Sequence, residues 1–297
     1  LFPEIFKETI RINTLDYELY RDMQQKIIDV LDTAEYVEVI GKGENQTNMQ
    51  VELAALSNPE KQTKFENCVA DVNIPLGEVF TSPKLAGTNG ILNVGTVYIG
   101  DIQYRNLRME FKDGRVVSAV CDNFVENGVI DQEAGHRLIV QGIMNGHETL
   151  PLGEFAIGTN TTAYAMAEKF GILDRLPILI VEKMGPHFAV GDTCYSWSED
   201  SPMYNPDGKE MIARDNEVSI LRKEDVSKAY FGVHTDITIP YKELERISAV
   251  HTDGTKTDII LDGRFVLAGL DELNKSCNCE DTESLQKVLS DCKTGIA

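Results

Sequence analysis

The stretch that most constrains the fold is LRMEFKDGRVVSAVCD, at residues 107–122. It holds two runs rich in β-forming residues, and Asp113-Gly114 between them is a dipeptide that closes two-residue hairpins. The segment therefore predicts two antiparallel strands joined by a tight turn. The region from Cys68 to Val120, which includes GTVYIG at residues 95–100, is β-rich in the same way. We expect a sheet of this kind at the centre of the fold.

Helical patterns are interspersed among the strands. Apolar spacing predicts an amphipathic helix over residues 15–33, a second helix around 132–143, and a short helix or turn over 165–173. EYVEVIGKG (35–43) alternates like a strand, and LPILIVEKMGPHFAVG (176–191) predicts a buried strand that ends at a Gly-Pro break. Residues 199–217 predict a loop. Because no βαβ rhythm is present, we expect an α+β domain with a mixed, largely antiparallel, barrel-like sheet and peripheral helices.

The charge balance limits the partners. The chain has 48 acidic and 28 basic residues, which gives a formal net charge of −20. Nucleic acids and anionic membranes bind clustered Lys and Arg, so neither is expected as a partner. An acidic chain suits metal cations or substrates that carry a free amine. No apolar stretch approaches the roughly 18 residues that a membrane span needs.

The cysteines predict a reducing location. They are scattered through a large chain, which is typical of reduced cytoplasmic thiols and not of a disulfide framework. The six are Cys68, Cys121, Cys194, Cys277, Cys279 and Cys292. Cys277-x-Cys279 could form a metal site, but it lacks the second pair that makes zinc spacing persuasive.

The two ends of the sequence differ from the rest. The chain starts at Leu1 with no readable signal peptide, which suggests a fragment or a processed form. Strands and helices continue to about Asn274, and the remaining residues form a cysteine-bearing tail. We therefore expect one domain over residues 1–274 and an appended tail over 275–297.

Two polar residues stand in a strand-like stretch, AYFGVHTDITIP, at residues 229–240. The period of two puts His234 and Asp236 on one face and Thr235 on the other. Such a pair is either part of a metal site or two polar residues facing water. His187 follows the Gly-Pro break of the apolar run, where a ligand can face a cavity, although a core or surface histidine is the alternative. The remaining histidines have no predicted role: His136, His147 and His251.

Two glutamates share one sequence context. Glu78 lies in NIPLGEVFTSP (73–83) and Glu154 in LPLGEFAIGTN (150–160), each after Leu-Gly and before apolar residues. A buried glutamate without a partner costs several kcal/mol or is driven neutral. A pair of divalent cations would remove that cost for Glu78 and Glu154, and His187, His234 and Asp236 could bind the same cations.

These motifs, with FKDGRVVSA (111–119) and EKMGPHFAVG (182–191), have the order and approximate spacing of a known family. From Leu15 to Leu267 the sequence resembles the catalytic domain of the thermophilic aminopeptidases, the M29 metallopeptidase family. The resemblance implies a metal-dependent aminopeptidase that releases N-terminal residues from peptides with a free N-terminus, using water activated by two divalent cations (zinc, cobalt or manganese). The resemblance also implies a homodimer. The sequence shows no counterpart of the family's N-terminal α/β domain, so it is expected to be a catalytic domain alone. The implied metal ligands are Glu78, Glu154, His187, Tyr195, His234 and Asp236.

Two roles remain open within that resemblance. Tyr195 follows His187 by eight residues, whereas the family's tyrosine follows by seven, and Cys194 occupies the seventh place. Tyr195 is therefore expected to ligate a metal or to stabilise the oxyanion, with Cys194 as the alternative. Glu182 is expected to be the general base, and its alternative role is an ion pair with Lys183 or another surface lysine.

The types of the ligand residues do not determine which kind of bond is hydrolysed. Glutamate, histidine and aspartate ligands also suit other two-metal hydrolases, such as amidases or esterases on the same scaffold. A non-catalytic metal-binding domain is a third possibility.

Overall fold

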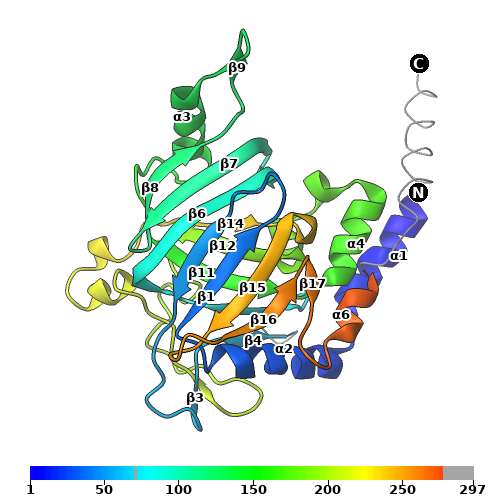
Figure 1. The fold of residues 1–297 in the computed structure, drawn as a ribbon, viewed down its shortest axis with the longest axis vertical. Helices are drawn as coiled ribbons and strands as arrows, with labels where there is room; N and C mark the ends of the chain where they lie inside the picture. The colour runs from blue at the N-terminus through cyan, green and yellow to red at the C-terminus, as the bar shows by residue number, and fades with distance from the viewer. Residues whose placement is uncertain (70–71, 277–297) are drawn as a thin grey trace.

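Two antiparallel sheets lie face to face in the computed structural model, which describes residues 1–69 and 72–276 (Figure 1). The larger sheet has eight strands in the order β17 (Arg264–Phe265), β16 (Lys256–Leu261), β15 (Leu244–Val250), β1 (Tyr36–Gly41), β2 (Asn48–Glu52), β6 (Lys84–Ile99), β7 (Ile102–Lys112) and β8 (Arg115–Val120). The smaller has five, in the order β14 (His234–Thr238), β12 (Pro186–Gly191), β11 (Leu152–Gly158), β5 (Glu78–Thr81) and β4 (Glu66–Cys68).

Two minor ribbons complete the strand set. One pairs β9 (Val125–Glu126) with β10 (Val129–Ile130), and the other pairs β3 (Gln62–Thr63) in parallel with β13 (Glu210–Met211). The prediction of an α+β fold with a mixed, largely antiparallel sheet is therefore confirmed. The sheets are open, however, and do not close into a barrel.

Helices lie at the periphery, as expected. They are α1 (Phe2–Asn13), α2 (Tyr17–Leu31), α3 (Gln132–Gly142), α4 (Thr161–Phe170), α5 (Ile178–Val181) and α6 (Asp271–Lys275). In Figure 1, α1, α4 and α6 gather at one side of the sheets and α3 lies near the projecting β9 ribbon at the other end. The Asp16 side chain caps α2 by accepting a hydrogen bond from the Leu19 amide, which satisfies a donor that the first turn leaves free.

The hairpin predicted from residues 107–122 is present. β7 and β8 pair through Lys112 and Arg115, and the two residues between them both have positive φ, 47° at Asp113 and 66° at Gly114. Both central residues of a type I′ turn need positive φ, and its twist matches that of the flanking strands. The Asp-Gly dipeptide thus accounts for this turn.

The prediction of a buried strand that ends at the Gly-Pro break, within residues 176–191, is wrong. Residues 178–184 form α5 and a 3-10 turn, and the strand β12 begins after the Gly-Pro break, at Pro186. A short apolar run cannot be assigned to helix or strand by periodicity alone. Here the two faces of the run differ, since Ile178 and Leu179 are exposed while Ile180 is buried.

The main core fills the space between the two sheets. It includes Val37 of β1, Val94 of β6, and Phe155 and Phe188 of the smaller sheet, all fully buried. The rings of Phe155 and Phe188 lie 5.2 Å apart, and burying each such ring contributes about 2–3 kcal/mol. This packing makes β11 and β12 a rigid support for the polar residues that they carry.

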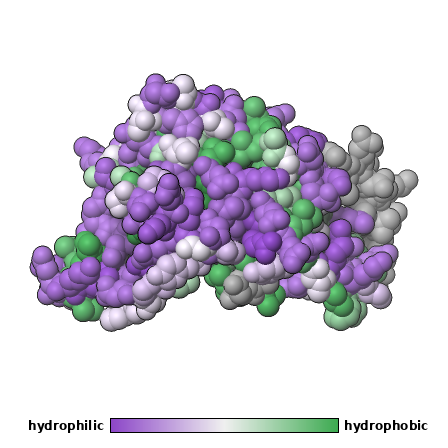
Figure 2. Space-filling view, turned by 90° about the horizontal axis from the view of Figure 1, so that it is seen from below, coloured by the Kyte–Doolittle hydropathy of each residue, from purple (hydrophilic) through white to green (hydrophobic). Residues whose placement is uncertain are grey.

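The surface agrees with the composition. The face seen in Figure 2 is largely hydrophilic, and its apolar side chains form separate patches. Among the described residues, no helix is both long enough and apolar enough to cross a membrane.

Candidate metal centre

Four neighbouring strands of the smaller sheet carry the predicted acidic and histidine residues. Glu78 is the first residue of β5, Glu154 lies in β11, and His187 is the second residue of β12. His234 and Asp236 both lie in β14. Antiparallel pairing places these strands side by side, so five residues from four distant sequence segments meet in one place.

Close backbone packing explains the Leu-Gly-Glu context. A Cβ on Gly153 would lie 2.1 Å from the carbonyl oxygen of Asp192, which no real Cβ contact allows. Gly77 has a φ of +130°, a conformation that side chains rarely adopt. In both segments the glycine lets the chain pass where a larger residue cannot, and the next residue, a glutamate, is buried in the sheet.

Glu154 is shared between the two histidines. Its Oε1 lies 3.6 Å from Nε2 of His187, and its Oε2 lies 3.1 Å from Nε2 of His234. Oδ1 of Asp236 is also near both rings, 4.0 Å from Nε2 of His187 and 3.6 Å from Nε2 of His234. Oε2 of Glu78 lies 3.4 Å from Nε2 of His187. The cluster thus has two halves that share the Glu154 carboxylate.

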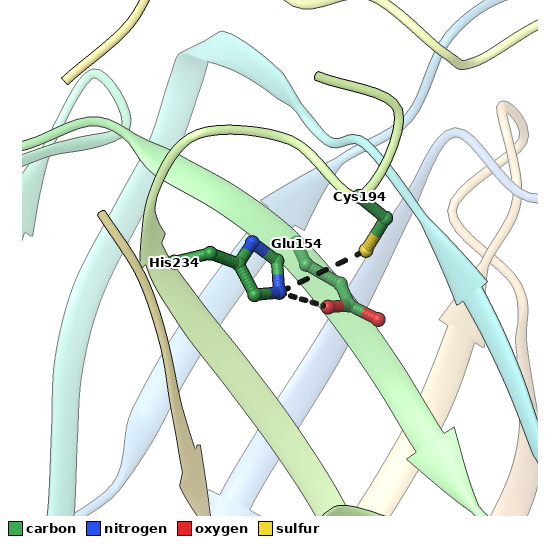
Figure 3. A group of neighbouring side chains, drawn as sticks. All are labelled: Glu154, Cys194 and His234. Carbon is green, nitrogen blue, oxygen red and sulfur yellow. Dashed lines mark hydrogen bonds and ion pairs between the residues drawn. The ribbon is translucent and has the colours of Figure 1, made fainter. Parts of the chain in front are cut away.

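A cysteine completes the half around His234. Figure 3 shows the Cys194 sulfur and the Glu154 carboxylate approaching the same ring edge of His234. The Cys194 Sγ lies 3.9 Å from Nε2 of His234. One ligand atom from each of Glu154, Cys194 and His234 lies within 4.8 Å of the others, and the same holds for Glu78, Glu154 and His187.

Backbone carbonyls orient both imidazoles. Nδ1 of His234 lies 2.7 Å from the carbonyl oxygen of Asp192, and Nδ1 of His187 lies 3.4 Å from that of Gly185. A carbonyl oxygen can accept a hydrogen bond but not donate one, so each contact favours the tautomer that carries its proton on Nδ1. In the neutral ring, which is the form that binds a metal, Nε2 then presents its lone pair toward the carboxylates.

Two buried oxygens in the cluster lack hydrogen bonds. Oε2 of Glu78 and Oδ1 of Asp236 are fully buried and have no hydrogen-bond partner among the described residues. An unsatisfied buried carboxylate oxygen is costly, and a divalent cation is the partner that carboxylates and imidazoles share. The donor set of carboxylates, imidazoles and a thiol therefore fits divalent cations such as zinc or cobalt.

The cluster shifts the pKa values of its members. Burial alone would raise the pKa of Glu154, but contacts with His187 and His234 hold it well below the usual range. Burial alone would lower the pKa of His187, but Glu154, Glu78 and Asp236 raise it to about 10. The same kind of contact raises the pKa of His234. Without a cation, the carboxylates thus hold protons on both rings.

A buried lysine borders the half around His187. Nζ of Lys183 forms ion pairs with Glu78 Oε1 and, at 2.6 Å, with Glu182 Oε1. The pairing that was the alternative role of Glu182 is therefore present, but the lysine is fully buried and not a surface residue. Burial raises the pKa of Glu182, and although Lys183 opposes this, the pKa lies at about 7.

Tyr195 does not join the cluster. Its hydroxyl donates a hydrogen bond to Glu66, and its ring packs 5.8 Å from that of Phe80 in a separate apolar group. The neighbouring residue, Cys194, points into the site in its place. The structure thus brings together Glu78, Glu154, His187, His234 and Asp236, and leaves Tyr195 aside.

The other histidines lie elsewhere. Nδ1 of His136 contacts the Ala119 carbonyl, His147 packs its ring edge on Phe231, and His251 contacts Thr33 and Thr257. Cys277, Cys279 and Cys292 fall outside the described residues, as does the predicted tail from residue 277 onward.

The cluster lines a cavity of about 690 Å³. Its walls combine the acidic residues with apolar side chains, among them Val72, Ile178, Leu179 and Trp197. Trp197 is 73 % exposed and stacks on Tyr230 with ring centroids 4.2 Å apart. The cavity can therefore admit a solute of amino-acid size to the carboxylate and imidazole groups.

The sequence pattern does not indicate the roles of two residues of this site, Lys183 and Asp192. An ion pair with Lys183 is predictable only as a surface contact, and no motif marks Asp192. In addition to the contact of its carbonyl with His234, the Asp192 carboxylate accepts hydrogen bonds from the Phe231 and Gly232 amides. These bonds hold the chain segment that leads into β14. The position of Asp192 three residues before Tyr195, beside Gly191, gave a turn signal, but nothing in the sequence linked that turn to His234.

Fold and site together define an α+β protein with a clustered carboxylate–histidine centre that fits divalent metal ions. A model of the thermophilic metalloprotease (M29) family matches residues 13–265, so the chain belongs to this family. A search of curated proteins found no match.

Solved structures that are similar to the chain include two from bacteria. Wild-type AmpT from Thermus thermophilus matches with a TM-score of 0.52 at 17 % identity, over 84 % of this chain and 55 % of that one. A 2,5-dihydroxypyridine dioxygenase from Pseudomonas putida KT2440 matches with a TM-score of 0.49 at 14 % identity, over 90 % of this chain and 64 % of that one. The chain thus spans about half the length of AmpT, and that likeness supports the fold.

Proposed function

We propose that the chain is a metal-dependent aminopeptidase that hydrolyses the first peptide bond of substrates with a free N-terminus. The arrangement of Glu154 carries the proposal, because its two oxygens face two different imidazoles. A carboxylate in that position can bridge two cations. Membership in the thermophilic metalloprotease family agrees with this chemistry.

The chain's own residues divide into two sets of ligands in this proposal. Glu78 and His187 would hold one divalent cation, His234 would hold a second, and Glu154 and Asp236 lie between them. When bound, such a pair of cations lowers the pKa of a water molecule toward neutrality and polarises a carbonyl oxygen. The buried Lys183 offsets part of the negative charge of this centre.

Glu182 is the proposed general base. It lines the same cavity, and its raised pKa of about 7 is suited to proton transfer near neutral pH. Its contacts with Lys183 and, at 3.4 Å, with the Asn73 side-chain amide both use Oε1. Oε2 would accept a proton from water and pass it to the leaving amine.

Two features of the cavity suit a peptide N-terminus. The clustered carboxylates favour a group that can be positively charged, and the exposed apolar side chains of Ile178, Leu179 and Trp197 can contact a substrate side chain.

Metal removal tests the reaction class. Dialysis against EDTA should abolish the release of p-nitroaniline from amino-acid p-nitroanilides, and added Zn²⁺, Co²⁺ or Mn²⁺ should restore it. Activity that persists after exhaustive removal of metal would contradict the proposal. His234→Ala should lose metal and activity together, whereas His251→Ala, outside the cavity, should keep both.

A substrate panel tests the need for the amine. Peptides with a free N-terminus should be cleaved, and the same peptides with an acetylated N-terminus should not. Equal cleavage of both would favour the alternative, a two-metal amidase or esterase. Metal binding with no hydrolysis of any substrate would favour a non-catalytic metal-binding domain.

A further inference from the structure

We propose that the Cys194 thiolate is a metal ligand at the half of the centre formed by Glu154 and His234. The proposal rests on the two-metal function above and adds a ligand of a different chemical class. Cys194 takes the place that the family resemblance would give to a tyrosine, because the Tyr195 side chain is turned away toward Glu66.

The distances fit a single cation. Nε2 of His234 lies 3.9 Å from the Cys194 sulfur, 3.1 Å from Glu154 Oε2 and 3.6 Å from Asp236 Oδ1. A tetrahedral zinc ion with bonds of about 2.0–2.3 Å separates its ligand atoms by roughly 3.3–3.7 Å. Small side-chain adjustments would therefore bring the Cys194, Glu154 and His234 atoms into one coordination sphere.

An independent observation points to a cation here. The side chain of Asp236 is more than nine-tenths buried, and its Oδ1 faces His234 without a hydrogen-bond partner among the described residues. His234 is held from behind by the Asp192 carbonyl, so its Nε2 is presented to the same point. The cysteine is thus one of three donors, with Glu154 and His234, whose ligand atoms lie within 4.8 Å of one another, and the Asp236 oxygen lies beside them, 3.6 Å from the His234 ring.

Local backbone structure explains why Cys194 and not Tyr195 reaches the site. Residues 193–196 form a turn in which the Ser196 amide donates to the Thr193 carbonyl. Within it Cys194 lines the cavity, whereas Tyr195 is buried on the other side against Phe80. The hydrogen bond to Glu66 fixes that orientation of the tyrosine.

A thiolate ligand has a chemical consequence. On coordination the thiol would give its proton to solvent, and the sulfur would donate an electron pair to the cation. Sulfur favours zinc and cobalt over the harder manganese. The half of the centre around His234 would therefore select soft cations, and the half around His187, with two glutamates, would be less selective.

Cobalt spectroscopy tests the inference independently of activity. We would use the full chain with Cys277, Cys279 and Cys292 replaced by Ser, because those thiols could also bind cobalt. Metal-free protein titrated with Co²⁺ should develop an intense near-ultraviolet sulfur-to-cobalt charge-transfer band. Cys194→Ser should abolish the band. Cys68→Ser, a thiol in the same cavity, and Cys121→Ser, a buried thiol outside it, should keep the band.

Metal affinity provides a second readout. Cys194→Ala should weaken the binding of one of the two zinc ions by more than about 100-fold. Removing a residue that only supports a metal ligand already weakens metal binding by up to about 100-fold, and Cys194 would be a ligand itself. Cys194→Asp should keep two ions and lose the band, and its preference for zinc over manganese should fall.

The outcomes separate the two proposals. Two bound cobalt ions without a charge-transfer band, or a band that survives Cys194→Ser, would overturn the thiolate ligand and leave the two-metal function standing. A band lost only in Cys68→Ser would overturn it as well. Failure to bind cobalt at all would overturn both.

Discussion

Oε2 of Glu154 lies 3.1 Å from Nε2 of His234, although the whole of β12 separates the strands that carry them. The residue of β12 that pairs with His234 is Gly191, which has no side chain to block the approach. A Cβ at Gly191 would lie 2.0 Å from the Val233 carbonyl oxygen. Three strands are thereby held closely enough for one carboxylate to face two imidazoles.

The shared position of Glu154 predicts unequal effects of ligand substitutions. Glu154→Ala should lose both cations, because its oxygens face both histidines. Glu78→Ala should lose one, because this residue faces only His187. The measurement is metal content per chain after equilibration with limiting free Zn²⁺. One ion lost from each variant would contradict a bridging role for Glu154.

Glu182→Gln should separate binding from turnover. The amide cannot accept the proton, so kcat should fall by about 10²- to 10⁴-fold, while metal content stays unchanged. Steady-state kinetics on amino-acid p-nitroanilides and metal analysis would check this. Near-normal turnover by the variant would show that another group acts as the base.

Lys183→Met should destabilise the metal-free protein strongly. The substitution leaves the buried carboxylates of Glu78 and Glu182 without their cation, which costs about 3–5 kcal/mol. Bound Zn²⁺ should recover part of this loss because it supplies positive charge beside Glu78. Urea unfolding with and without zinc would measure both effects. Lys42→Met, which removes an exposed pair with Asp262, is the control and should change stability little.

Gly153→Ala should weaken metal binding although Gly153 is not itself a ligand. The added Cβ would press on the Asp192 carbonyl, which orients the His234 ring. We expect zinc affinity to fall by roughly 10- to 100-fold, as for other losses of a ligand's supporting contact. Gly95→Ala, at a residue that does not line the cavity and whose nearest neighbours are atoms of the Glu243 side chain, should leave affinity unchanged. Equal affinities in the two variants would contradict this positioning role.

Cation uptake should release protons. The pKa of His187 is raised to about 10, so below that pH its ring carries a proton that a cation must displace. Affinity should therefore rise with pH through the range 6.5 to 10, by about tenfold per unit for each proton released. Calorimetric titrations with Zn²⁺ in buffers of different ionisation enthalpy would count the protons. A pH-independent affinity would contradict the protonated state of the metal-free cluster.

The same shift has an opposite consequence for the metal-free fold. A histidine whose folded pKa lies above its unfolded value of 6.5 stabilises the protein fully below pH 6.5, and this contribution disappears as pH rises through about 10. Metal-free protein should lose the contribution of His187 across that window, whereas the zinc-loaded protein should not. Thermal melts at a series of pH values would show the difference.

Much of the fold could be predicted from local pattern. Asp113-Gly114 specified its hairpin, and apolar spacing specified α2, because turn conformation and helix amphipathicity are local properties. The pattern failed at residues 178–184, where a short apolar run forms helical turns with one buried and one exposed face. That choice depends on what lies beside the run, which sequence alone does not contain.

The sequence by itself determined which residue types were available: two Leu-Gly-Glu segments, the His-x-Asp pair, and a histidine after a Gly-Pro break. Those choices are local, since glycines permit the close packing and strand alternation places His234 and Asp236 on one face. Only the tertiary structure decided that Lys183 is buried among the carboxylates and that Cys194, not Tyr195, faces His234. Both depend on contacts between segments far apart in the chain, and a one-residue difference in a turn reverses which side chain reaches the cavity.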